Sequence, residues 1–167
     1  HGLKVRVKSR NQYLIQARPG YWAVPKQQEP IAQERRVDRE VMGSGTLNEL
    51  PALFDSALAK TDTGEPALDV VLHLDVREFH FVEKDGVRTQ NLIFIAALFD
   101  GSGNFVAGKE TNIKFALTEP TYNRMAENGI DMSVTLQAPP GTYRLRAVAQ
   151  DAIDGKVVSS TLPVEIR

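Results

Sequence analysis

The stretch that decides the fold runs from Pro139 to Asp151 and has the sequence PPGTYRLRAVAQD. After the Pro-Pro-Gly turn, two rows of side chains alternate along the chain, which is typical of a β-strand. The first row is mainly apolar and comprises Tyr143, Leu145, Ala147 and Ala149. The second row comprises Thr142, Arg144, Arg146 and Val148. The pattern predicts a strand whose first row enters a core and whose two arginines lie on the outer face.

Tyr143 opens this strand directly after a glycine-bearing corner. That position matches the tyrosine corner of immunoglobulin-like sandwiches, in which the ring packs inside and the hydroxyl is tied to the preceding loop. Any tyrosine at the start of a strand has a similar sequence, so further strands are needed to support the fold.

Residues 64–167 supply those strands, because apolar alternation and short turns recur at regular intervals. Residues 92–99 are apolar on both faces, which predicts a central strand covered on both sides. We count seven strands, with a bend within residues 66–83. The region is therefore predicted to be mainly β, an immunoglobulin-like or fibronectin type III-like antiparallel sandwich.

Two further segments precede the predicted sandwich. Residues 1–24 are expected to form an N-terminal β segment of two strands, with a basic row at Lys4, Arg6 and Lys8 that is more often a solvated face than a phosphate site. Residues 25–63 have the composition of a linker, with a weak helix that ends at 43–45. A second helix is predicted over about 48–60, because Asn48 can cap it and apolar residues follow at helical spacing.

Composition excludes several classes of function. The net charge of −1 provides no general attraction to nucleic acid, and no apolar run approaches the roughly 20 residues of a membrane span. The chain has no cysteine, which excludes disulfides, thiolate zinc sites and a cysteine nucleophile. Because it begins with His1 rather than methionine, we expect a fragment or a processed product of a longer protein.

The polar motifs do not form a catalytic or metal-binding set. Asp100 to Asn104 places oxygen side chains at alternate positions, as a calcium loop does, but Thr111 stands where such a loop has its bidentate glutamate. His73 and His80 are expected to be exposed or hydrogen-bonded. We therefore predict no catalytic residue, no metal ligand and no cofactor, and hence no enzyme.

Five residues are candidate ligand contacts. The aromatic ones, Tyr21, Trp22 and Tyr122, have the flat rings that stack on sugars or bases, although burial is the commoner fate of a single tryptophan. The other two, Arg144 and Arg146, are expected side by side on the outer face of their strand. They can recognise a carboxylate or pair with acidic residues of a neighbouring strand.

Two stretches resemble the von Willebrand factor A-related domain proteins of Acidobacteria. The basic strand from Lys4 to Lys8, followed by QARPGYWA at residues 16–23, resembles the end of the A domain, although Pro19 stands where the family usually has a basic residue. Residues 139–160 resemble the β-domain that follows in those proteins. The resemblance implies that the Asp-x-Ser-x-Ser adhesion loop lies upstream, since this sequence contains none, and that the protein is exported to the cell envelope or beyond.

Taken together, these features predict a non-catalytic module that binds or scaffolds proteins through sandwich loops or an exposed sheet edge. The alternative is a carbohydrate-binding accessory domain that uses exposed aromatic rings. The expected partner is a protein, or in the alternative a glycan, and neither nucleic acid nor a transmembrane segment is expected.

Overall fold

The structure is a computed structural model that describes residues 36–167. The chain divides into two units, His1–Ala32 and Gln33–Arg167, and the described residues belong to the second. The predicted β segment 1–24, with Tyr21 and Trp22, lies outside the described residues.

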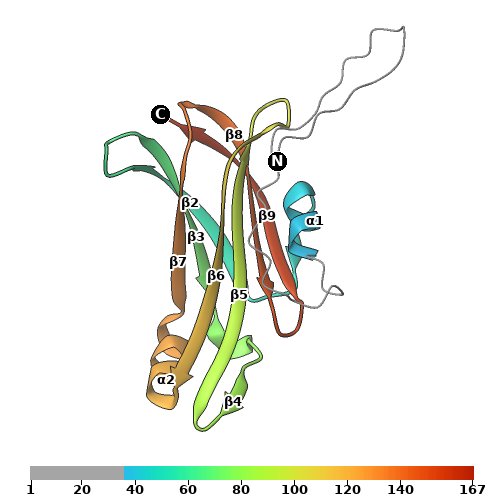
Figure 1. Ribbon diagram of the computed structural model, residues 1–167, viewed down its shortest axis with the longest axis vertical. Coiled ribbons are helices and arrows are strands. Elements are labelled where there is room, and N and C mark those ends of the chain that lie inside the picture. Colours follow the sequence, from blue (N-terminus) through green and yellow to red (C-terminus); the bar gives the residue numbers. More distant parts are fainter. Residues whose placement is uncertain (1–35) are drawn as a thin grey trace, which may run out of the picture. The chain divides into compact units, whose positions relative to one another are not determined.

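The described part holds nine strands, two α-helices and one short 3-10 helix (Figure 1). Along the chain they are α1 (Arg36–Met42), β1 (Leu47–Asn48), β2 (Ala52–Lys60), β3 (Pro66–Leu74), η2 (Val76–Glu78), β4 (Val82–Lys84), β5 (Val87–Phe99), β6 (Phe105–Thr118), α2 (Glu119–Asn128), β7 (Ile130–Gln137), β8 (Gly141–Asp151) and β9 (Val157–Ile166).

These strands form two antiparallel sheets. The larger sheet has the order β1-β9-β8-β5, and β5 pairs along its other edge with β6, while the short β4 pairs with the first residues of β5. The smaller sheet has the order β2-β3-β7. We call them sheet A and sheet B. The mainly β, antiparallel sandwich predicted from the sequence is confirmed, and seven of the nine strands lie within residues 64–167.

The core fills the space between the two sheets because each strand sends alternate side chains inward. From β8 these are Tyr143, Leu145, Ala147 and Ala149, the row predicted from the sequence. On the sheet B side the inward residues of β3 are Leu68, Val70, Leu72 and Leu74. Phe54 of β2 stacks on Phe94 of β5 with ring centroids 5.9 Å apart, so sheet B is joined to sheet A through its edge strand as well.

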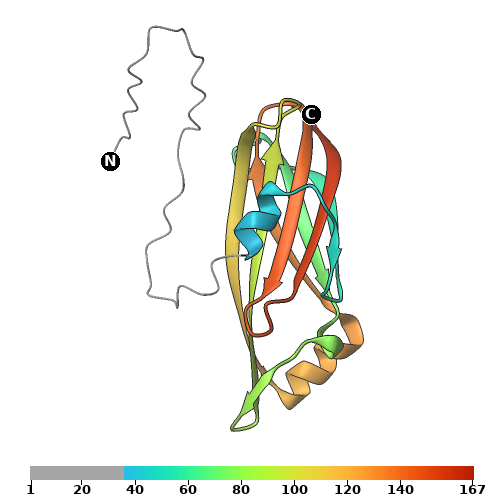
Figure 2. The same ribbon diagram turned by 90° about the vertical axis from the view of Figure 1, so that its right-hand side faces the viewer.

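Helix α1 covers part of the outer face of sheet A (Figure 2). Its Val37 packs with Ile95, Val148 and Val157 in a second, smaller apolar cluster. The central strand β5 is therefore buried on both faces, as its sequence predicted. The weak helix expected before Gly43 is α1, whose Val37 and Val41 pack against the sheet while Met42 is 53% exposed.

The helix predicted over about 48–60 is wrong, since residues 52–60 form strand β2. All nine of its residues are paired with β3, from Ala52 opposite Leu74 to Lys60 opposite Pro66. Phe54 and Leu58 fit a helical stripe, but they also fit the two-residue period of a strand, and pairing with β3 decides between the two. The segment 36–63 is accordingly not a linker, because α1, β1 and β2 all pack onto the sandwich.

Candidate functional site

Strand β2 is an edge strand of sheet B in the part of the chain that the structure describes. Within the described residues it pairs with β3 alone. The Asp75 amide donates to the Pro51 carbonyl oxygen at one end of the ladder, and the Thr61 amide donates to Glu65 at the other. Both pairs involve odd-numbered residues of the β2 segment, and hydrogen-bonded pairs alternate along an antiparallel ladder. The even-numbered residues from Ala52 to Lys60 therefore direct their amide and carbonyl groups away from β3.

Two of these outward amides already have partners. The Ser56 amide donates a hydrogen bond of 2.7 Å to the carboxylate of Asp55, its immediate neighbour in the chain. The Ala52 amide is likewise satisfied within the turn that precedes the strand, by the Leu50 carbonyl oxygen at 2.9 Å. The amides of Phe54, Leu58 and Lys60 remain directed toward the unpaired edge.

Large apolar side chains are exposed on the same strand. Leu53 is 73% exposed and lies on the outer face of sheet B, while Leu58 is 55% exposed although it belongs to the inward row. Leu58 stays exposed because the described chain places no strand beyond β2 to cover it. Backbone donors and apolar side chains are thus available together, which is the combination that an added strand uses.

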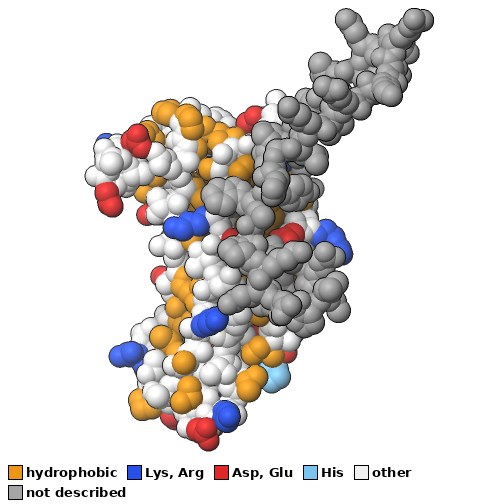
Figure 3. Space-filling view, in the orientation of Figure 1, with side chains coloured by type: hydrophobic (Ala, Val, Ile, Leu, Met, Phe, Trp, Pro, Cys, Tyr) orange, Lys and Arg blue, Asp and Glu red, His pale blue; other side chains and the backbone are white. Residues whose placement is uncertain are grey.

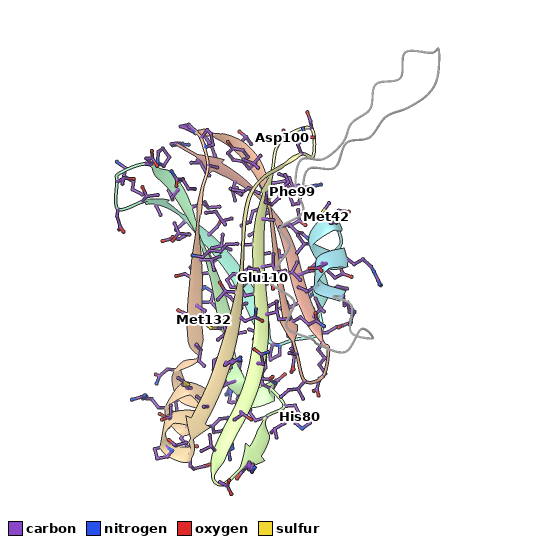
Figure 4. The ribbon with its side chains drawn as sticks, viewed as in Figure 1. Met42, His80, Phe99, Asp100, Glu110 and Met132 are labelled. Atoms are coloured by element: carbon purple, nitrogen blue, oxygen red, sulfur yellow. The ribbon has the colours of Figure 1, made fainter. Side chains whose placement is uncertain are left out.

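The other sheet edges are guarded against strand addition. The edge of β9 is partly covered by β1, and Pro163 removes one donor from the remainder. The edge strand β6 carries Lys109, Glu110 and Lys114, and Figure 4 shows Glu110 midway along it. Charged side chains on an edge strand discourage pairing with another chain. β7 also contacts β6 at that side of the sandwich and β9 contacts β2 at the other, but no described strand pairs with the outer edge of β2.

A small polar pocket lies at one end of the sandwich, with a volume of about 210 Å³. Its lining includes Glu49, His80, Asp151 and Lys156. Asp151 is almost fully buried, but its carboxylate accepts the amides of Ile153 and Asp154 and the Gln90 side chain, so it holds the β8–β9 turn. His80 Nδ1 lies 2.9 Å from the carboxylate of Asp154.

A second pocket carboxylate, that of Glu49, also has structural partners, while Glu78 lines the pocket from η2. Glu49 forms a bidentate pair with Arg36 of α1 at 2.6 and 2.7 Å and accepts the Val157 amide. The Arg36 hydrogen bond is the main cause that lowers the pKa of Glu49, and the Val157 amide adds to it. The pocket therefore uses these side chains to tie α1 and the β8–β9 turn to the sandwich. Within residues 36–167, no three His, Asp or Glu side chains are grouped to hold a metal ion.

The predicted contact residues fall into different environments. Arg144 is exposed, and its guanidinium lies over the Phe99 ring, 5.3 Å from the centroid. Tyr122 on α2 is half-buried, with the Phe81 ring edge-on at 5.7 Å and the Arg88 guanidinium 4.0 Å above its centroid. The described residues thus hold the Tyr122 ring between two neighbours. Tyr21 and Trp22 lie outside them.

Arg146 is not a surface residue, contrary to the prediction. Its side chain is on the outer face of β8 as expected, but α1 lies above it and leaves it 1% exposed. The guanidinium donates to the carbonyl oxygens of Glu40 and Gly45 and to the hydroxyls of Thr161 and Ser159. Burial lowers the pKa of Arg146, while the nearby Glu40 carboxylate opposes that change. Arg146 fastens α1 to sheet A and cannot meet a ligand in this arrangement.

The side chain of Asp100 stabilises the β5–β6 hairpin loop, and Figure 4 labels this residue at the tip of the loop. Its carboxylate accepts the amides of Ser102 and Asn104 and the Asn104 side chain at 2.8–3.0 Å. Hydrogen bonding from Asn104 is the main cause that lowers the pKa of Asp100. The histidines are hydrogen-bonded and exposed as predicted, since His73 pairs with Asp131 at 2.7 Å.

The free edge was missed by sequence reasoning because residues 48–60 were assigned to a helix. A partial signal was present, since Ala52, Phe54, Ser56 and Leu58 occupy alternate positions, as one row of a strand does, but the apolar Leu53 in the other row obscures it. Neither described helix has the length and apolar character of a membrane span.

No protein-family model and no curated protein matches this chain. Among solved structures, it is similar to a chain titled "X-ray structure of Northeast Structural Genomics Consortium target SoR45". The two are 9% identical, the match covers 71% of this chain and 85% of that one, and the TM-score is 0.27.

Proposed function

We propose that this chain is a non-catalytic protein-binding or scaffolding module of a larger exported bacterial protein, and that its contact is the edge of β2. The observation that carries the proposal is the unpaired edge, which combines outward amides at Phe54, Leu58 and Lys60 with the exposed side chains of Leu53 and Leu58. The export and bacterial origin rest on the family resemblance of the N- and C-terminal motifs.

Strand addition suits this edge on physical grounds. An extended peptide gains main-chain hydrogen bonds from an unpaired strand, and the side chains beside it determine which peptide fits. Unprotected edges invite unwanted pairing, so they are usually blocked by charge, proline or a covering segment. The edge of β9 is partly covered by β1 and carries Pro163, whereas β2 has neither a covering strand in the described chain nor a proline, and this contrast favours a use for β2.

The non-catalytic part of the proposal is supported by the contacts of the polar pocket. Catalysis requires acid, base or nucleophilic groups that can reach a substrate. The carboxylates of Asp151 and Glu49 instead hold backbone amides and the Arg36 guanidinium. The carbohydrate-binding alternative gains no support from Tyr122, because Phe81 and Arg88 contact its ring.

The test is a titration of the isotopically labelled full chain with a neutral, strand-forming peptide of nine residues that alternates valine and threonine. We expect the largest NMR shifts at the amides of Phe54, Leu58 and Lys60, and protection of these amides from hydrogen exchange. The decisive pair of variants is Leu58→Pro and Leu58→Ala. Both remove the leucine side chain, but only proline removes the edge amide, at a position where no β3 hydrogen bond is lost.

Binding by Leu58→Ala but not by Leu58→Pro supports the proposal. Equal binding by the two variants, or shifts confined to other strands, contradicts it. Circular dichroism and a thermal melt of each variant establish that both remain folded.

A further inference from the structure

We infer that the strand added to β2 alternates apolar residues with lysine or arginine, and that its basic row lies over the outer face of sheet B. This inference rests on the proposed function, because it names the chemistry of the partner for the same edge. It is carried by the placement of acidic residues next to that edge.

Sheet B and its β2–β3 loop are strongly acidic. Residues 52–74 and 130–137 contain five acidic residues and one lysine, a net charge of −4 with histidine neutral. In Figure 3 acidic side chains stand out at the tip of the β2–β3 hairpin. Residues 36–167 together have a net charge of −6, so most of their acidity is concentrated in this sheet and its loop.

The acids lie on the outer face in neighbouring rows of the sheet. The strand register places Asp55 of β2 opposite Val71, and Asp69 of β3 between Ala57 and Thr135. Asp131 of β7 is opposite His73, which in turn is opposite the exposed Leu53. Adjacent strands are about 4.8 Å apart and same-face residues along a strand about 7 Å apart. A new strand beside β2 therefore lies one strand from Asp55 and two strands from Asp69, whereas Asp131 is three strands away, at about 14 Å, and pairs with His73.

Small residues of β2 leave a path to the more distant acid. Ala57 separates the partner position from Asp69, and a long lysine or arginine side chain opposite Ala57 can pass over its methyl group. Long side chains reach diagonal and second-strand neighbours in this way. A basic residue opposite Asp55 meets that carboxylate directly.

The inner row of the added strand faces a different surface. It lies beside Phe54, Ser56 and Leu58, and Leu58 is half exposed because the described chain provides no neighbour on this side. Apolar partner side chains at these positions complete the burial of Leu58. The two faces of β2 thus select an alternation of apolar and basic residues.

Asp55 links the charge preference to the backbone pairing. Its carboxylate accepts a hydrogen bond from the Ser56 amide. If an added strand is to pair past the middle of β2, a carbonyl oxygen of the partner must replace this carboxylate as the acceptor. A basic partner side chain receives the carboxylate that is released. A neutral strand leaves it without a counter-charge, so the exchange favours a basic partner.

The same charges disfavour a second copy of this chain as the partner. Antiparallel pairing of two β2 strands about Ser56 brings the Asp55 residues of both copies onto one face, on either side of the symmetry axis. Like charges at neighbouring sheet positions destabilise the pair. The partner strand is therefore expected to belong to a different segment, with basic residues.

The test uses the full chain and four nine-residue peptides. Three of them alternate valine with a second residue, which is lysine, glutamate or threonine. The fourth, a block peptide, contains the same residues as the valine–lysine peptide but groups the valines and the lysines separately. Affinities are measured by isothermal titration calorimetry at two ionic strengths, and the site is located by NMR. We expect the valine–lysine peptide to bind most tightly, with an affinity that falls as salt rises.

Two triple variants separate local from general charge. The first carries Asp55→Asn, Asp69→Asn and Asp131→Asn. The second, a matched control with the same change in net charge, carries Asp85→Asn, Glu110→Gln and Glu127→Gln. Two exposed ion pairs, at Asp55 and Asp69, together correspond to a change in affinity of about threefold to tenfold. We expect that loss for the valine–lysine peptide in the first variant only.

The outcomes distinguish this inference from the proposed function. If all three alternating peptides bind at β2 with equal affinity, or both triple variants weaken binding equally, the basic-partner inference is wrong and the edge remains a binding site. If no alternating peptide binds at β2, both are wrong. If the block peptide binds as tightly as the valine–lysine peptide, the inference is also wrong, because non-specific electrostatic attraction then explains the affinity.

Discussion

The Tyr143 hydroxyl donates a hydrogen bond of 2.7 Å to the Pro139 carbonyl oxygen, four residues earlier in the chain. To do so the ring folds back over Gly141, where an added Cβ atom would lie 3.2 Å from the hydroxyl oxygen. The glycine therefore provides the space for the corner, and the hydroxyl fixes the turn that enters β8.

Removing this hydroxyl should weaken the fold slightly. Tyr143→Phe keeps the ring in the core and loses one hydrogen bond, so we expect the free energy of unfolding to fall by about 0.5–1.5 kcal/mol. Urea denaturation measures the change. The control is Tyr122→Phe, because the Tyr122 hydroxyl forms no hydrogen bond within residues 36–167 and the ring contacts with Phe81 and Arg88 remain. An unchanged midpoint for Tyr143→Phe would show that the corner bond contributes nothing.

Removing the Arg146 guanidinium should have a larger effect. Arg146→Met leaves the Glu40 and Gly45 carbonyl oxygens without their donor beneath α1, and we expect a loss of about 3–5 kcal/mol. The control is Arg144→Met on the same strand, since Arg144 is exposed and its guanidinium lies over the Phe99 ring. Its expected cost is below about 1 kcal/mol.

Hydrogen exchange adds a structural measurement to the Arg146 experiment. We expect the amides of α1 to lose protection in Arg146→Met while those of β3 keep it. If α1 stays protected and the two arginine variants are equally stable, Arg146 does not fasten the helix.

Gly129 should not tolerate a side chain. It ends α2 with φ of 73° and ψ of −177°, a region that is essentially restricted to glycine, and its amide donates to Met125. An alanine Cβ would also lie 3.3 Å from the Leu74 carbonyl oxygen. We expect Gly129→Ala to cost about 1–3 kcal/mol in thermal or urea unfolding. Gly45→Ala is the matched control, because its Cβ meets nothing within 4 Å, and it should cost less.

Asp75 should titrate at unusually low pH. It begins η2, and hydrogen bonds from the Arg77 side chain, followed by the Arg77 amide, lower the pKa of Asp75 to about 2 from an ordinary 3.8. Because the folded-state pKa is the lower one, the associated stabilisation is complete above pH 3.8 and disappears as the pH falls toward 2.

Carboxyl chemical shifts recorded from pH 1.5 to 6 measure this titration. In Arg77→Ala the largest cause is removed, so the pKa of Asp75 should rise toward its ordinary value and the low-pH loss of stability should begin at higher pH. A wild-type midpoint near 3.8 would contradict the expected ion pair.

Several features were predictable because local sequence and tertiary structure agree on them. The alternation in residues 142–149 specified which side of β8 faces the core, and the apolar run 92–99 specified a strand covered on both faces. Tyr143 could be assigned to a corner because its partner lies only four residues away.

The candidate site was not predictable, because it depends on which strands lie side by side. Leu53 and Leu58 are exposed only because β2 is an edge, and the spacing of Phe54 and Leu58 is compatible with both helix and strand. Arg146 follows the same logic: its side of the strand was correct, but its burial depends on α1, which is more than one hundred residues away in the sequence.

By itself, the sequence determined the class of the fold and the inward row of β8, because side chains alternate strictly along an extended backbone. Only the tertiary structure decided that residues 52–60 are a strand at a sheet edge, that Arg146 is covered and that the acids of three strands share one face. These properties depend on contacts between distant segments, whose free energies outweigh local conformational preferences.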